Sequence, residues 1–150
     1  METEKYLELA LAEAKKAYKK GEVPIGAVIV RDGKVLSRAF NLRESRQNAL
    51  YHAEILAIKR ACRKLKSWRL IGCDLYVTLE PCPMCAGAIK EARISNVFFG
   101  AYDPKGGACG SVIDVLEADK FCHNVNVVGG IMEAECGGII KQFFRERRGK

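Results

Sequence analysis

Three residues with metal-binding side chains and one carboxylate lie in two short motifs of this chain. The first motif is HAE at positions 52–54, and the second is PCPMC at positions 81–85. Catalytic zinc sites usually take three histidine, cysteine or carboxylate ligands and leave a fourth position for water. We therefore expect His52, Cys82 and Cys85 to bind one zinc ion per chain.

A closed structural zinc site would need a fourth side-chain ligand, and the sequence supplies no good candidate for it. The only other histidine, His123, has no cysteine pair beside it, so a structural role is expected there. The other cysteines are scattered without metal-ligand spacing, so we interpret them as small apolar residues that are mostly buried. These are Cys62, Cys73, Cys109, Cys122 and Cys136. The ligand set therefore favours an open, catalytic site.

Glu54 is the candidate proton carrier, because zinc makes hydroxide available near neutral pH and a carboxylate can then move the protons. In a regular helix, positions two apart point about 200° away from each other. His52 and Glu54 can therefore reach one site only if a helix is just beginning there. Taken alone, Cys-x-x-Cys is often a redox motif or chance, and Glu54 would be a common helix N-terminal charge. The combination favours a catalytic zinc site.

The apolar spacing predicts how these motifs are positioned. It indicates helices over residues 3–20, 52–65, 83–92 and 131–148, and strands over residues 27–30, 34–40, 75–79, 97–99 and 125–128. Asp32-Gly33 is typical of a hairpin turn. Both motifs then open helices, where the helix dipole helps cysteines to bind as thiolates. Strands alternating with helices predict a mixed sheet with helices on both faces, in one domain over residues 1–150.

Composition and charge limit the classes of protein to which this chain can belong. Apolar residues make up 49% of the chain, and no apolar run approaches the roughly 20 residues of a membrane span. The charged start lacks a signal-peptide pattern, so we expect a cytoplasmic protein. The net charge is +7, with six basic residues in 59–69 and five in 141–150. Such clusters fit a polyanionic partner or a merely solvated basic face, and charge alone does not choose between them.

Longer stretches around the motifs resemble the bacterial tRNA-specific adenosine deaminases. The resemblance covers about residues 23–148 and is carried by VPIGAVIV, YHAEILAIKRA, SWRLIGCDLYVTLEPCPMCAGAI and GACGSVIDVL. His-x-Glu followed by Pro-Cys-x-x-Cys is also the pattern of zinc deaminases of nucleobases. The resemblance implies an α/β fold, a cytidine-deaminase-like three-layer α-β-α sandwich with a mixed five-stranded sheet. It also implies a homodimer that converts adenosine to inosine at the wobble position of a tRNA anticodon loop.

The resemblance also implies a role for individual residues. His52, Cys82 and Cys85 match the zinc ligands, and Glu54 matches the proton shuttle. Residues expected at the base are Asn41 on the purine edge, Ala53 through its backbone, and Ile25 as apolar lining. Residues expected at the flanking RNA are Asp103, Lys105, Phe144 and Arg145.

Several of these residues also have ordinary structural interpretations. Asn41 could be a turn residue that bonds its own backbone, and Ile25 could belong to the core. At least one of Phe143 and Phe144 should pack, since helix neighbours diverge by about 100°. The chain also departs from the family pattern. It has Ala-Leu-Tyr at 49–51 where Pro-Thr-Ala is common, which alters the pocket rim, and Cys-His-Asn at 122–124 where Asn-His-Arg is common.

Two rival functions stay open from the sequence. The first is a deaminase of a free base or nucleoside, such as guanine or cytosine. The basic tail and the YDPKGG loop at 102–107 argue against it, because a small neutral substrate has no use for them. The second is a zinc-stabilised RNA-binding module without activity. Glu54 and the missing fourth ligand argue against that function.

Overall fold

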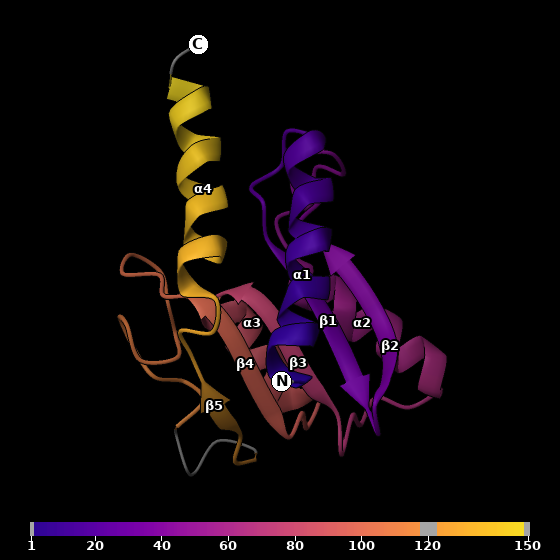
Figure 1. Cartoon of the computed structure of the whole chain (residues 1–150). Helices are drawn as coiled ribbons and strands as arrows, with labels where there is room; N and C mark the ends of the chain where they lie inside the picture. The colour runs from indigo at the N-terminus through magenta and orange to yellow at the C-terminus, as the bar shows by residue number, and fades with distance from the viewer. Residues whose placement is uncertain (1, 118–122, 149–150) are drawn as a thin grey trace.

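A computed structural model describes residues 2–117 and 123–148 and shows one mixed five-stranded sheet (Figure 1). Its strands, in the order β2-β1-β3-β4-β5, are β1 (Gly26–Arg31), β2 (Lys34–Phe40), β3 (Asp74–Leu79), β4 (Asn96–Ala101) and β5 (Asn126–Val128). The helices are α1 (Glu2–Lys19), α2 (Ala53–Leu65), α3 (Pro83–Glu91) and α4 (Glu133–Arg148). The predicted elements are all present, with small shifts at their ends.

The sheet is mixed because a hairpin opens it and crossovers complete it. Strand β1 pairs antiparallel with β2 and with β3, whereas β3, β4 and β5 run parallel to one another. The predicted turn is confirmed, since Asp32 and Gly33 both have positive φ angles, of 50° and 75°. A type I′ hairpin requires such angles at both central residues. The carboxyl ends of β3 and β4 lie side by side, so the loops that follow them meet.

Helices cover both faces of the sheet, which confirms the three-layer α-β-α sandwich. On one face, α1 and α4 form a small core with sheet residues such as Val28 and Tyr76. On the other face, α2 and α3 pack over a larger core that includes Ile29, Leu75 and Phe99. Figure 1 shows α1 and α4 on the near side and α2 and α3 behind the strands. None of the described helices has the length and apolar character needed to cross a membrane.

Local chemistry sets where the helices begin and end. After α1, Gly21 adopts a φ of +76°, the left-handed conformation that ends many helices. Helix α4 begins at Glu133, two residues later than the predicted start, because Gly130 and Met132 both have positive φ and turn the chain. The helix then continues without a break through residues 137–138, although two adjacent glycines weaken a helix.

Candidate active site

The metal-binding side chains converge where α2 and α3 begin. His52 is the N-cap of α2 and Cys82 is the N-cap of α3, with Pro83 in the first turn. The Nδ1 atom of His52 lies 3.6 Å from the Sγ atom of Cys82 and 3.6 Å from that of Cys85. Zinc–nitrogen and zinc–sulfur bonds of ordinary length in a tetrahedron separate those atoms by about 3.5 Å. The three donors therefore fit a zinc ion.

The two thiols of this cluster differ in proton affinity. A hydrogen bond from Cys85 lowers the pKa of Cys82 to about 4; burial opposes this shift, and His52 adds to it. The hydrogen bond to Cys82 and burial raise the pKa of Cys85. Of the two thiols, Cys82 therefore loses its proton more readily. One imidazole and two sulfurs that can bind as thiolates suit a divalent cation.

Glu54 lies beside the donors and is only 4% exposed. Burial raises its pKa to about 7, and its carboxyl group is within hydrogen-bonding reach of Cys85. His52 has an extended backbone and α2 begins at Ala53, so the helix starts between the histidine and the glutamate. The helix therefore begins where the sequence analysis required it, and the side chains of His52 and Glu54 are not held on opposite sides of a formed helix.

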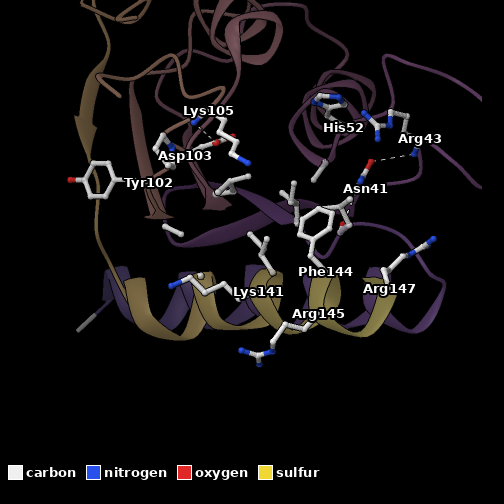
Figure 2. Close-up of a pocket in the computed structure, with 18 of the residues that line it drawn as sticks. Asn41, Arg43, His52, Tyr102, Asp103, Lys105, Lys141, Phe144, Arg145 and Arg147 are labelled. Atoms are coloured by element: carbon white, nitrogen blue, oxygen red, sulfur yellow. Dashed lines mark hydrogen bonds between the residues drawn. The ribbon is translucent and has the colours of Figure 1, made fainter. Parts of the chain in front are cut away.

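A cavity of about 1020 Å³ opens beside His52 and Ala53. All seven residues that the sequence placed at the substrate line this cavity: Ile25, Asn41, Ala53, Asp103, Lys105, Phe144 and Arg145. Figure 2 shows Asn41 in the loop after β2, Asp103 and Lys105 in the loop after β4, and Phe144 and Arg145 on α4. Ile25 lies just before β1, and Ala53 is the first residue of α2. The residues that the family resemblance implies therefore lie around one cavity.

Most of the charged residues that line the cavity are basic. Six basic side chains line it against one carboxylate, Asp103; the six are Arg43, Lys105, Lys141, Arg145, Arg147 and Arg148. Four of them belong to α4. The sequence predicted Lys105 and Arg145 at the substrate, but it did not point to Arg43. Arg43 follows Asn41 by two positions in the same loop, which is the only signal that could have identified it.

Asn41 is 6% exposed and is hydrogen-bonded to the backbone of its own loop and to that of the segment before β1. Its Oδ1 accepts from the Arg43 amide at 3.2 Å, and its Nδ2 donates to the Val23 carbonyl at 3.4 Å. The turn interpretation of Asn41 is therefore correct, and the residue lines the cavity as well. The loop beyond it is tied to Glu22, whose carboxylate accepts hydrogen bonds from the backbone amides of Glu44 and Ser45.

The two adjacent phenylalanines of α4 have separate environments. Phe143 is 6% exposed and meets the Tyr18 ring at 5.7 Å, whereas Phe144 is 43% exposed and lines the cavity. Figure 2 shows Phe144 pointing into the cavity and Arg145 extending away from it at the edge. Arg147 lies over the Phe143 ring and donates a hydrogen bond to the Gly21 carbonyl. One phenylalanine packs, as expected, and Arg147 holds α4 to the end of α1.

The remaining cysteines and histidine take structural places within the described residues. Cys73 and Cys136 are buried, while Cys62 and Cys109 are partly buried, and burial raises the pKa of all four. Cys122 lies outside the described residues. His123 places its Nε2 at 2.9 Å from the Ile94 carbonyl, so it supports the chain. Within the described residues, the only group of at least three candidate metal donors is His52, Cys82 and Cys85.

Comparison with known proteins agrees with this geometry. Residues 1–148 match the MafB19-like deaminase family. A tRNA-specific adenosine deaminase of Bacillus subtilis strain 168 is 54% identical over 98% of this chain and 91% of its own length. A tRNA-specific adenosine deaminase of Aquifex aeolicus is 45% identical over 99% of this chain and 97% of its own length.

A solved structure from work on A-to-I editing by tRNA:A34 deaminases at the wobble position of transfer RNA has a TM-score of 0.87 and 47% identity. It covers 90% of this chain and 98% of that chain. These matches extend over 90% or more of the chain. The chain belongs to the MafB19-like deaminase family and, within it, to the tRNA-specific adenosine deaminases.

Proposed function

We propose that this protein hydrolyses adenosine to inosine at the wobble position of a tRNA anticodon loop. The observation that carries the substrate choice is the cavity. At about 1020 Å³ it lies at the upper end of the roughly 300–1,000 Å³ of small-molecule pockets, and six basic side chains line it. A free base is neutral and small, whereas nucleotides of an RNA loop bring phosphates that these cations would meet.

The reaction adds water to the adenine ring carbon that bears the amino group and releases ammonia. We propose that His52, Cys82 and Cys85 hold zinc, which when bound supplies a Lewis acid that activates water near neutral pH. Glu54 takes a proton from the attacking water and delivers one to the leaving amino nitrogen. Its buried position beside the donor cluster suits both transfers.

Three residues at the inner wall suit the base itself. Asn41 keeps one further lone pair on Oδ1 and one further N–H on Nδ2 beyond its backbone bonds, so it can still pair with a purine edge. Ile25 offers an apolar surface to the ring. Ala53 is buried at the start of α2 and offers its backbone. A base can reach this wall only when it leaves its stack, as loop nucleotides readily do.

The outer wall suits the nucleotides on either side of the base. We assign this role to Asp103, Lys105, Phe144 and Arg145. Phe144 is an exposed aromatic ring on which a base can stack. Lysine and arginine contacts to phosphate add affinity without reading sequence.

We further propose that the chain is one zinc-dependent deaminase domain, that it acts as a homodimer, and that it works in the cytoplasm, where its tRNA substrate is found.

A rival substrate class has a specific relative behind it. A structure of guanine deaminase from Bacillus subtilis is 40% identical with a TM-score of 0.63, and it covers 66% of this chain and 64% of that chain. Competition between substrates tests the choice. An anticodon stem–loop with adenosine at the wobble position should be deaminated far faster than free guanine, cytosine or adenosine. Equal or faster turnover of a free base, measured as released ammonia, would contradict the RNA assignment.

The oligomeric state has its own test. Sedimentation at micromolar concentration should give the mass of two chains. A monomer that deaminates the stem–loop at full rate would contradict the dimer proposal and leave the reaction proposal intact.

A further inference from the structure

The carboxylate of Glu80 is buried, at 2% exposed, and the reaction described above does not use it. It directly follows β3. Its Oε1 accepts hydrogen bonds from the Asp103 amide at 3.0 Å and from the Ser111 hydroxyl. Its Oε2 accepts from the amides of Cys109 at 2.9 Å and Ser111 at 3.1 Å. One buried side chain thus collects four donors from both ends of a single loop.

That loop, residues 102–111, forms one wall of the cavity through Tyr102, Asp103, Pro104 and Lys105. Two backbone hydrogen bonds fasten the same region to the segment of Glu80. The Glu80 amide donates to the Ala101 carbonyl at 2.9 Å, and the Ala108 amide donates to the Pro81 carbonyl at 2.8 Å. Hydrogen bonds to an ionised acceptor are roughly twice as strong as neutral ones. The Glu80 side chain accepts four hydrogen bonds from this loop, twice the number of those two backbone bonds.

Two neighbouring glycines show how closely the loop wraps around the carboxylate. A Cβ atom at Gly107 would lie 2.3 Å from Cδ of Glu80 and 2.4 and 2.5 Å from its two oxygens. A Cβ atom at Gly106 would meet nothing nearer than 3.4 Å, at the Asp103 carboxylate. Only glycine at position 107 lets the loop close on Glu80, whereas position 106 has room for a methyl group.

We propose that Glu80 is a positioning residue that holds the 102–111 loop against the cavity, so that Asp103 and Lys105 meet the nucleotides beside the reacting adenosine. This inference rests on the proposed function for its substrate. Asp103 continues the arrangement outward, because its Oδ1 accepts from the amides of Lys105 and Gly106, both at 3.1 Å. Glu80 orders Asp103, and Asp103 orders the backbone of Lys105.

The kinetic test compares Glu80→Gln and Gly107→Ala with the matched control Gly106→Ala. Glutamine presents an NH2 group where an acceptor is needed, and alanine at position 107 pushes the loop away. Both variants should raise KM for the stem–loop about tenfold or more, the effect of losing one good contact. Their kcat should stay within about threefold, and each should keep one metal ion per chain. Gly106→Ala should match the wild-type KM.

The outcome separates positioning from support of the metal site. Loss of bound metal and of kcat together would show that Glu80 only supports Cys82, and an unchanged KM in both variants would overturn the proposal outright.

Hydrogen exchange of the Asp103, Cys109 and Ser111 amides tests the anchoring without any substrate. These amides should exchange faster in Glu80→Gln and Gly107→Ala than in wild type and Gly106→Ala; equal rates would overturn the anchoring. Failure of wild-type protein to deaminate RNA would instead contradict the proposed function.

Discussion

At the residue scale, the site depends on where two helices begin. His52 and Cys82 are both N-cap residues, with extended backbones, and their side chains leave the chain before the first helical turn. Cys85 follows inside the first turn of α3, and Glu54 follows inside the first turn of α2. If α2 began a turn earlier, the side chains of His52 and Glu54 would point about 200° apart. The boundary of the helix is therefore part of the catalytic arrangement.

Cys85→Ala should lose the metal and the activity together, because two donors are left where three are needed. The loss of metal affinity should exceed the roughly 10–100-fold that follows removal of a group that only supports a ligand. Metal content per chain and deamination rate measure both effects. Cys62→Ala, which removes a partly buried thiol away from the cluster, should keep both. A Cys85→Ala protein with one metal ion per chain and full activity would rule out this ligand set.

Sequence and structure agree best at the donors and less well around them. The two short motifs carry their donor atoms at fixed spacing, so it could be predicted that His52, Cys82 and Cys85 form a group able to hold a metal ion. Arg43 and Glu80 could not. Their importance comes from the segments that the fold brings against them. The neighbouring Asn41 is the only nearby signal for Arg43, and no spacing pattern marks the contacts of Glu80.

At the element scale, the cavity walls are loops fastened by buried carboxylates. Glu22, three residues after the end of α1, holds the loop that carries Asn41 and Arg43, and it is 1% exposed. Glu80, directly after β3, holds the loop across the cavity. Periodicity predicted the helices and strands because those depend on apolar spacing. The loop conformations depend on single buried carboxylates, which a hydrophobic pattern does not reveal.

Glu22→Gln should lower the free energy of unfolding at neutral pH. Its difference from wild type should become smaller as the pH falls. Burial acts to raise the pKa of Glu22, but hydrogen bonds from Ser45 and Glu44 and the charge of Arg43 outweigh it, so the folded-state pKa lies below its ordinary value. The stabilisation is therefore complete above the ordinary pKa and is lost as pH falls through the folded value. Hydrogen bonds to a charged group are worth about 1.5–3 kcal/mol.

Urea unfolding of wild type and Glu22→Gln at a series of pH values measures this difference. It should be largest near pH 7 and should close below the ordinary carboxyl pKa of about 4.3. A difference that stays constant down to the lowest pH would show that the charge of Glu22 contributes nothing.

Gly26→Ala should destabilise the protein by about 1–3 kcal/mol, the usual cost of overpacking a core. A Cβ atom there would lie 2.0 Å from the Ala10 carbonyl oxygen and 2.5 Å from the Ala14 amide nitrogen, which are rigid backbone atoms of α1. The midpoint of denaturant unfolding measures the effect. Gly138→Ala, on an exposed turn of α4 with nothing within 4 Å, should instead gain about 0.5–1 kcal/mol. Equal midpoints for the two variants would show that α1 does not pack on β1 this closely.

At the scale of the whole molecule, the positive charge is divided between two places. The basic segment of α4 lines the large cavity. The other basic segment contributes Lys59, Arg60 and Arg63 to a separate pocket of about 200 Å³ on α2. Charge counting on the sequence found both segments but could not tell which one faces the site. The tertiary fold decides that, because it places α4 beside the loops that follow β2 and β4.

Replacing Arg145 and Arg148 together by alanine should weaken RNA binding and its dependence on salt. Two phosphate contacts contribute about 1.4 to the slope of log affinity against log salt, at about 0.7 each for single strands. Arg147 is left in place, because it holds α4 to Gly21. Binding titrations at several salt concentrations give the slope. The matched variant Lys15→Ala/Lys34→Ala removes two exposed charges outside the cavity and should keep the wild-type slope. An unchanged slope in the arginine variant would exclude α4 from the RNA interface.

The donor cluster and Glu54 together are expected to deaminate one adenosine, at the wobble position of a tRNA anticodon. The most direct measurement maps inosine by position in an unmodified tRNA after incubation with wild-type protein and with Glu54→Gln. Wild type should produce inosine at the wobble position and leave the other loop adenosines unchanged. Glu54→Gln should keep its metal and be slower by about 10²–10⁴-fold, the usual contribution of a general acid–base group. Inosine spread over several loop positions would contradict selectivity for the wobble adenosine. A Glu54→Gln rate within a few-fold of wild type would contradict the role of Glu54 as the proton carrier.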